Sequence, residues 1–226
     1  MLSLAGRTRQ PAPQPVAVRT GGFGGAAGLA TYLSTERIDV LIDGTHPYAA
    51  QMSANAAAAA AATGVAFVAL RRPAWGPVTG DRWINVADVN EAVRTLGSAP
   101  RRVFVALGRK ELTPFLSAPQ HDYLVRSVDP IEPPLQLPHT SYVTGRGPFT
   151  EAGDRELLRE FGADVIISKN SGGQATYSKI AAARALGLEV IMVRRPELPR
   201  VASAETVEDV IGWLDHQLAP SPDRGV

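Results

Sequence analysis

The sequence predicts an α/β fold in which parallel strands alternate with helices. Four times, a short apolar, β-branched run ends at a small loop that carries a cation or a hydroxyl, and a helix-like segment follows. In the clearest case the run 163–168 leads into the loop 169–173 and the helix-like segment 174–186. The other three apolar runs span residues 40–43, 103–107 and 141–143. Runs of this kind, separated by helices, are typical of strands buried in a parallel sheet.

An internal echo predicts two similarly built domains. An alanine-rich helix, a strand and the exit Arg-Arg-Pro occur twice in this order, and the two exits lie at residues 71–73 and 194–196. A chain of 226 residues is long enough for two small α/β domains. Because a complete strand–loop–helix series restarts at Arg102, the segment 97–100 is the favoured boundary. We therefore expect domains at residues 1–98 and 99–226.

The remaining elements follow in chain order. Residues 1–5 resemble the end of a strand, and residues 16–19 form a second strand before the glycine cluster 21–25. The segment 48–63 is almost entirely alanine, the best helix former, and its smooth face lets a helix lie close to a sheet. Further helices are expected at 26–34, 89–96 and 206–218, further strands at 65–70 and 83–86, and a proline-rich loop at 129–138.

Composition and charge exclude several classes of function. With 45% hydrophobic residues the chain can build real cores, whereas a net charge of +1 gives no field that would attract nucleic acid. No cysteine is present, and the four histidines are scattered, so we expect no disulfide, thiolate or metal site. No apolar run reaches the roughly 18 residues of a membrane span, and no signal-peptide pattern occurs. We expect a cytoplasmic monomer.

Cations follow several of the predicted strands. The carboxyl ends of parallel strands meet at one edge of a sheet, where open α/β folds bind their ligands. Cations there, beside backbone N–H groups at helix starts, predict a site for an anion-rich ligand. The candidate residues are Arg109, Lys110, Arg146, Lys169, Asn170 and Ser171. The alternatives are exposed, solvated cations, a tight Gly-Arg-Gly-Pro turn and a helix cap at Asn170 or Ser171.

An ordered set of motifs carries a family resemblance. The motifs occupy residues 41–49, 53–55, 108–111, 126–128, 145–149 and 168–173. In this order they resemble precorrin-6A reductase of cobalamin biosynthesis over nearly the whole chain. The resemblance implies two Rossmann-like domains with parallel sheets and a ligand cleft between them. It also implies an NADPH-dependent reduction of one double bond of precorrin-6A, which gives precorrin-6B.

The resemblance assigns the two domains to different ligands. Residues 1–98 would bind NADPH, and residues 99–226 would contribute to binding the tetrapyrrole. Several acetate and propionate carboxylates surround a precorrin ring, so its site needs several cations. The family's first strand and glycine-rich loop would precede Ser3, and we expect them upstream of Met1. Without them, we expect NADPH binding to be weak.

Two loops and a turn in the first domain are candidates for cofactor binding. The residues are Gly6, Arg7, Thr8, Gly22, Thr45, His46 and Pro47. Arg7 follows the first predicted strand, and an arginine there favours the 2′-phosphate of NADPH. No acidic residue between Met1 and Tyr32 could bind the free 2′-hydroxyl of NAD. The alternatives are a basic loop, a flexible glycine turn and a helix with Pro47 in its first position.

The reaction also requires a proton. His46, Lys169 and Tyr177 are the conceivable donors, and water is equally suitable. The alternative function is a non-catalytic binding protein for an anionic tetrapyrrole or a nucleotide, for which the same cations would serve. Binding of NADPH discriminates between them, because the enzyme requires it and the binding protein does not.

Overall fold

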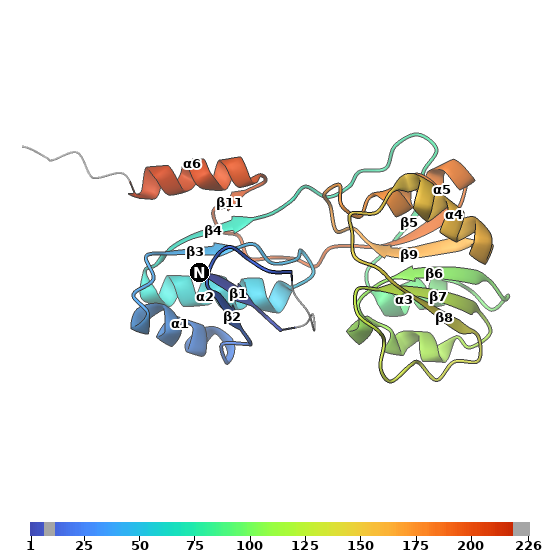
Figure 1. The fold of residues 1–226 in the computed structure, drawn as a ribbon, viewed down its shortest axis with the longest axis horizontal. Helices are drawn as coiled ribbons and strands as arrows, with labels where there is room; N and C mark the ends of the chain where they lie inside the picture. The colour runs from blue at the N-terminus through green and yellow to red at the C-terminus, as the bar shows by residue number, and fades with distance from the viewer. Residues whose placement is uncertain (7–11, 219–226) are drawn as a thin grey trace, which may run out of the picture. The chain divides into compact units, whose positions relative to one another are not determined.

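The computed structural model describes residues 1–6 and 12–218, which form two compact units (Figure 1). Of these residues, unit 1 comprises 1–6, 12–73 and 196–218, and unit 2 comprises 74–195. The chain leaves unit 1 after Pro73 and returns to it at Pro196. These are the prolines of the two Arg-Arg-Pro exits, so within residues 12–218 the repeated motif marks both crossings between the units.

This division corrects the domain boundary expected at residue 98. Strand β5 (Arg82–Val86) pairs in parallel with β10 (Glu189–Val193) along its whole length, and helix α3 (Val89–Thr95) packs against β10. Segment 82–95 is therefore part of unit 2, although it precedes the series that restarts at Arg102. The pairing partner lies about a hundred residues away, and local sequence carries no signal for it.

The sheet of unit 2 has six parallel strands in the order β5-β10-β9-β6-β7-β8. The strands not yet given are β6 (Arg102–Ala106), β7 (Asp122–Ser127), β8 (Thr140–Thr144) and β9 (Val165–Lys169). From β6 the chain moves through β7 to β8 at one edge, and β9 then returns to lie beside β6. The order reverses between β6 and β9, so the topological switch point lies at their carboxyl ends.

Helices α4 (Glu151–Phe161) and α5 (Ser178–Leu186) pack on each other and on this sheet (Figure 1). Leu158 and Ile180 of these helices join Phe104, Ile166 and Met192 in one core, and each of these five residues is at most 1% exposed. The start of α4 is capped by Thr150, whose side chain accepts a hydrogen bond from the backbone N–H of Gly153. The short 3₁₀ helices η1 (Arg109–Glu111) and η2 (Thr113–Ser117) follow β6.

Unit 1 contains two smaller parallel sheets. The strands β1 (Leu2–Leu4) and β2 (Val18–Thr20) form one, and the other has the order β11-β4-β3. Its members are β3 (Val40–Asp43), β4 (Ala66–Leu70) and β11 (Ser203–Ala204). Every strand pair of the described residues is parallel, which confirms the predicted fold class.

The helices of unit 1 are α1 (Gly25–Thr35), α2 (Ala50–Thr63) and α6 (Val207–Leu218). Leu29 and Leu33 of α1 pack against Ala56 and Ala59 of α2, as expected for an alanine face that permits close approach. Gly64 ends α2 in the left-handed conformation. Among the described residues, no helix combines the length and apolarity needed to cross a membrane.

Candidate functional site

The switch point of unit 2 is bridged by an ion pair. Lys169, the last residue of β9, places its Nζ 2.5 Å from Oε1 of Glu111 in the loop after β6. The other carboxylate oxygen of Glu111 accepts a hydrogen bond of 3.1 Å from the backbone N–H of Gly108. The Lys169 side chain is only 16% exposed. A cation predicted to bind an external anion therefore already has a carboxylate partner, which sequence reasoning did not assign.

The next two candidates do not cap a helix. Helix α5 begins at Ser178, seven residues after Ser171, so the interpretation of Asn170 or Ser171 as a cap is wrong. Instead, the side-chain oxygen of Asn170 accepts from the backbone N–H of Trp75, and its amide donates to the carbonyl of Trp75, both at 2.8 Å. The indole of Trp75 donates to the carbonyl of Gly173 at 2.9 Å. Asn170 therefore fixes the loop after β9 to the segment around Trp75.

Arg146 lies on an exposed loop, 145–149, between β8 and α4. The backbone N–H of Gly145 donates to the carbonyl of Ser127, and that of Phe149 donates to the carbonyl of Ala175. A Cβ at Gly147 would stand 3.0 Å from the Ala175 carbonyl oxygen, a tight contact that glycine avoids. The loop with Arg146 and the loop after β9 therefore lie side by side.

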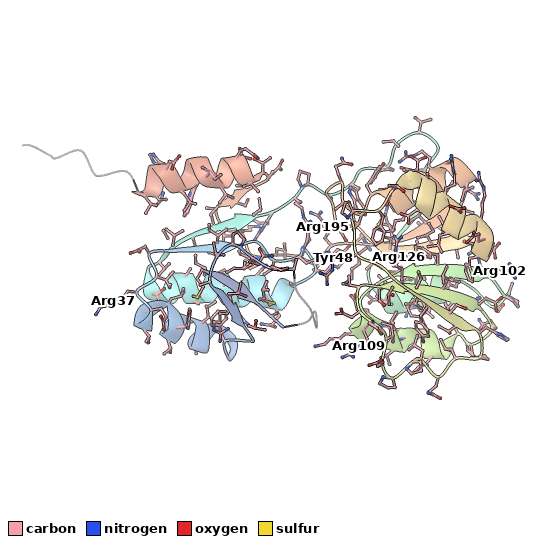
Figure 2. The ribbon with its side chains drawn as sticks, in the orientation of Figure 1. Arg37, Tyr48, Arg102, Arg109, Arg126 and Arg195 are labelled. Atoms are coloured by element: carbon pink, nitrogen blue, oxygen red, sulfur yellow. The ribbon has the colours of Figure 1, made fainter. Side chains whose placement is uncertain are left out.

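Arg109 and Lys110 are exposed in η1, at the same edge of the sheet. Arg109 donates to the carbonyl of Glu132 at 3.1 Å, so it also fixes the proline-rich segment. Arg126, near the end of β7, is buried; both arginines are labelled in Figure 2. Unit 2 thus gathers all of its predicted cations at the carboxyl edge of one sheet, together with one that was not predicted.

Beneath these loops lies a cluster that we call the buried ion cluster: Arg126, Asp154, Ser178 and Lys179, each less than 10% exposed. Arg126 forms an ion pair with Oδ1 of Asp154, and the Ser178 hydroxyl donates to Oδ2 at 2.6 Å. Burial lowers the pKa of Lys179 to about 7; the nearby Arg126 guanidinium adds to this, and Asp154 opposes it.

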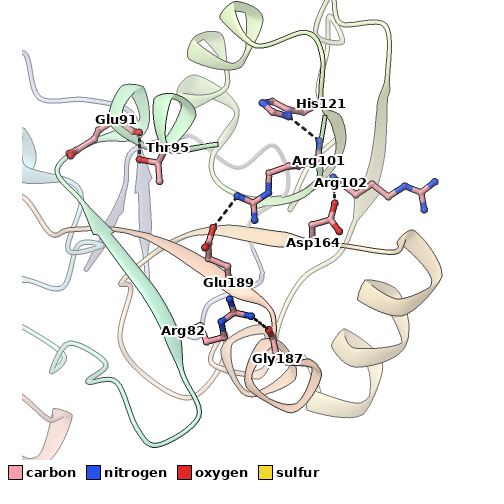
Figure 3. Close-up of polar contacts among 9 residues, drawn as sticks. All are labelled: Arg82, Glu91, Thr95, Arg101, Arg102, His121, Asp164, Gly187 and Glu189. Atoms are coloured by element: carbon pink, nitrogen blue, oxygen red, sulfur yellow. Dashed lines mark hydrogen bonds and ion pairs between the residues drawn. The ribbon is translucent and has the colours of Figure 1, made fainter. Parts of the chain in front are cut away.

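At the opposite, amino edge of the same sheet, ion pairs and hydrogen bonds connect the starts of the strands (Figure 3). Arg101, just before β6, forms an ion pair of 3.0 Å with Glu189 at the start of β10. The carboxylate of Asp164 accepts from the backbone N–H of Arg102 at 2.8 Å. His121 is fully buried, and its Nδ1 accepts from the backbone N–H of Arg101. These contacts join the strand starts to one another, away from the carboxyl edge.

In unit 1 the turn after β3 is organised by a buried carboxylate. Asp43 accepts from the Ser53 hydroxyl at 2.6 Å and from the backbone N–H of Thr45 at 3.0 Å. His46 accepts at Nδ1 from the backbone N–H of Tyr48, and Pro47 is buried. Because α2 begins at Ala50, Pro47 is not its first residue, and that alternative is wrong. Thr45, His46 and Pro47 form a fixed turn at the carboxyl end of β3.

The glycine cluster lies between β2 and α1. Arg19 donates to the carbonyls of Gly21 and Gly22 at 2.8 and 2.9 Å, and its guanidinium lies 4.0 Å from the ring centroid of Phe23. No described atom would lie within 4 Å of a Cβ added at Gly21 or Gly22. The first turn of α1 has no acidic residue, and no side chain of the described residues caps it. This N-terminus can therefore receive an anion.

Gly6, which follows β1, has φ +68°, and a Cβ there would lie 3.1 Å from the Thr20 side chain. Arg7 and Thr8, the other two candidates of this loop, lie outside the described residues. His46, Lys169 and Tyr177 stay candidates for the proton donor. The Tyr177 hydroxyl accepts a hydrogen bond from Arg184. None of the described residues form a cluster suited to hold a metal ion.

Sequence reasoning missed Arg19, Glu111 and the members of the buried ion cluster. A signal existed for Arg126, because a cation inside the apolar run 123–127 must find a partner in the core. Glu111 stood beside two predicted cations in the motif 108–111. Asp154 gave no signal, since an acidic residue in the first turn of a helix is usually explained by the helix dipole alone.

Comparison with known proteins identifies the family. A model of the family described as "Precorrin-6x reductase CbiJ/CobK" matches residues 1–215. The precorrin-6A reductase of a Sinorhizobium species is 54% identical over 220 residues, which are 97% of this chain and 84% of the relative. That of Rhodobacter capsulatus is 51% identical over 227 residues, 100% of this chain and 89% of the relative. A solved structure described as "CobK precorrin-6A reductase" superposes with a TM-score of 0.93 at 51% identity, covering 99% of this chain and 88% of the other. Nothing in these matches favours a non-catalytic binding protein.

Proposed function

The chain belongs to the precorrin-6A reductase family, and we propose that unit 1 binds NADPH and unit 2 binds the carboxylates of the tetrapyrrole. The chain is an oxidoreductase of cobalamin biosynthesis that reduces a double bond of precorrin-6A with NADPH. One observation carries the assignment of unit 2. Its four predicted cations, Arg109, Lys110, Arg146 and Lys169, all lie at or just after the carboxyl ends of strands in one parallel sheet.

The residues of unit 1 fit a dinucleotide. The loop 21–25 combines glycines that leave room for a close approach with the uncapped N-terminus of an 11-residue helix. Arg19 holds this loop through two carbonyls, so the loop is ordered before a ligand arrives. When bound, NADPH supplies the hydride. Gly22 would approach the phosphates, and Gly6, Arg7 and Thr8 the ribose and its 2′-phosphate. Thr45, His46 and Pro47 would lie near the nicotinamide.

In unit 2, Arg146 and Lys169 are the central candidates for the substrate carboxylates. Lys169 stands at the topological switch point, where its Nζ already contacts Glu111. An incoming carboxylate would share Lys169 with Glu111 or displace it, so Glu111 holds the ammonium group in place until the substrate binds. Arg146 lies on a neighbouring loop and could reach a second carboxylate of the same ring. Asn170 and Ser171 position the backbone between them.

Binding measurements on single variants test the division. Arg146→Ala and Lys169→Ala should each weaken binding of the tetrapyrrole by about 1.5–3 kcal/mol, the range for hydrogen bonds to charged groups. The dissociation constant of NADPH should stay unchanged in both. As a matched control, Arg102→Ala removes an exposed arginine at the amino edge of the same sheet, and it should affect neither ligand. If the unit 2 variants weaken binding of NADPH and leave binding of the tetrapyrrole unchanged, the assignment of ligands to the two units is reversed.

The cytoplasmic location and the monomeric state stay predictions. Size-exclusion chromatography with light scattering measures the mass directly, and a dimer would contradict the second of them.

A further inference from the structure

The carboxylate of Asp154 is the centre of the buried ion cluster. Both carboxylate oxygens of Asp154 are used, Oδ1 by the guanidinium of Arg126 and Oδ2 by the hydroxyl of Ser178. These residues come from β7, the first turn of α4 and the first turn of α5. The side chains of Arg126 and Asp154 are only 7% and 4% exposed. Three elements are therefore joined at a single carboxylate.

Stability alone gives no reason for this cluster. Removing charges from water costs several kcal/mol per ion, and an apolar set of similar volume often stabilises a core as well or better. The cost is increased by Lys179, a second cation in the same buried region. What a buried ion pair provides instead is direction, because its hydrogen bonds fix the groups that make them.

The cluster contacts two segments with substrate candidates, the loop that carries Arg146 and the loop after β9 that carries Asn170 and Ser171. The ring centroid of Phe149, in the Arg146 loop, lies 4.0 Å from the guanidinium of Arg126. Phe149 also donates its backbone N–H to Ala175 in the loop after β9. Lys179 donates to the carbonyl of Thr176, in that second loop, at 2.6 Å. Arg126 therefore contacts the Arg146 loop through Phe149, and Lys179 contacts the loop after β9 through Thr176.

The second loop is also linked to the cluster through Trp75. Lys179 Nζ lies 4.9 Å from the centroid of the Trp75 ring, and the same indole donates to the carbonyl of Gly173. The backbone of Trp75 is paired with the side chain of Asn170, the residue after Lys169. A displacement of α5 would therefore pass along this loop toward Lys169.

We propose that Asp154 is a positioning residue for the tetrapyrrole: through Arg126 and Ser178 it sets the loop that carries Arg146 and the loop that follows Lys169. The proposal rests on the function assigned to unit 2, and it adds a residue that does not itself contact the substrate. Asp154 acts at a distance because it joins α4 and α5, the helices that follow the two loops, to β7. Replacing Asp154 should weaken binding of the tetrapyrrole and not of NADPH, since NADPH is assigned to unit 1.

Steady-state kinetics of Ser178→Ala and Asp154→Asn test the proposal. Ser178→Ala removes one hydrogen bond to Asp154, and the KM for precorrin-6A should rise roughly tenfold, the equivalent of one such bond. Asp154→Asn should raise it at least as much, while the KM for NADPH should not change in either variant. Ser178→Thr retains the hydroxyl and should restore a value close to that of the unchanged protein. If Asp154→Asn does not fold, the pair Ser178→Ala and Ser178→Thr still decides.

Glu189→Gln is the matched control for a merely structural role. It breaks the Arg101–Glu189 ion pair in the same unit, at the amino edge of the sheet, and should lower Tm without changing either KM. If Ser178→Ala lowers Tm in the same way and leaves the KM for precorrin-6A unchanged, the cluster is structural and the proposal fails. If Ser178→Ala raises only the KM for NADPH, the assignment of ligands to units fails instead.

Discussion

The two units are built from the same kind of segment, yet they bury their strands to different extents. In β9 of unit 2 the residues Val165, Ile166 and Ile167 are all 0% exposed. In β3 of unit 1 the corresponding run is equally apolar, but Ile42 is 41% exposed. Strand β9 pairs with β10 on one side and β6 on the other, whereas the described residues pair β3 with β4 alone.

The neighbouring strands, and not the residue composition, determine this difference in burial between β9 and β3. Within unit 1, β4 lies between β3 and β11, and its Val68 is only 1% exposed. An apolar run therefore predicts a strand, but its burial depends on which strands and helices cover it, and those partners come from distant parts of the chain. The candidate sites of the two units also differ in the contacts that hold their loops. Unit 2 holds its candidate loops with buried charges, whereas unit 1 holds its glycine loop with a single arginine over an aromatic ring.

The largest expected effect compares one isoleucine from each unit. Ile166→Ala deletes fully buried methylenes at the centre of the unit 2 sheet and should lower the free energy of unfolding by about 2–5 kcal/mol. Ile42→Ala removes the same atoms from a half-exposed position and should cost less than about 1 kcal/mol. Urea denaturation of both variants measures the difference. Equal losses would mean that Ile42 is buried in solution.

The second-largest expected effect is a loss of NADPH affinity that originates in unit 1. Arg19→Ala removes two hydrogen bonds to the carbonyls of Gly21 and Gly22 and the contact with Phe23, so the glycine loop loses its order. The dissociation constant of NADPH should rise by the equivalent of about 1–2 kcal/mol, and that of the tetrapyrrole should not change. Arg37→Ala, an exposed arginine of the same unit, serves as the control in isothermal titration. A change in tetrapyrrole binding would show that the loop serves both ligands.

A smaller effect, in the opposite direction, is expected in unit 2. Glu111→Gln neutralises the carboxylate beside Lys169 but retains an acceptor for the N–H of Gly108. Lys169 would then interact more strongly with a substrate carboxylate, and precorrin-6A should bind more tightly by about 0.5–1 kcal/mol. Titration of the tetrapyrrole into both proteins measures the shift. Weaker binding would indicate instead that the position in which Glu111 holds Lys169 matters more for the substrate than their competition.

These contrasts also indicate which features were predictable. The motif at 169–173 was correctly assigned to a strand end, because β-branched residues followed by polar residues and glycines are a local signal. The start of α5 was expected at residue 174 and is found at Ser178, because a turn at residues 175–177 separates the left-handed Gly172 and Gly173 from the helix. The partner of Lys169 could not be predicted, because Glu111 reaches it only through the pairing of β6 with β9. Sequence identified the cations, and the fold determined their partners.

The smallest effect is a pH dependence that should originate in unit 2. Burial lowers the pKa of His121 below its ordinary value of 6.5; a hydrogen bond involving the backbone of Gly97 opposes this, and the nearby Arg101 adds to it. The folded protein therefore binds fewer protons at this site than the unfolded chain. The contribution of His121 is complete above pH 6.5 and is lost as the pH falls below that value toward the folded pKa. Its neutral Nδ1 accepts from the backbone N–H of Arg101, and protonation would remove that acceptor.

Thermal melts between pH 7.5 and 5 should show a decline in Tm that is shallower in His121→Gln. His216→Gln, which changes an exposed histidine on α6 of unit 1, should leave the decline unaltered. If the two variants have the same slope, the acid sensitivity arises elsewhere in the chain.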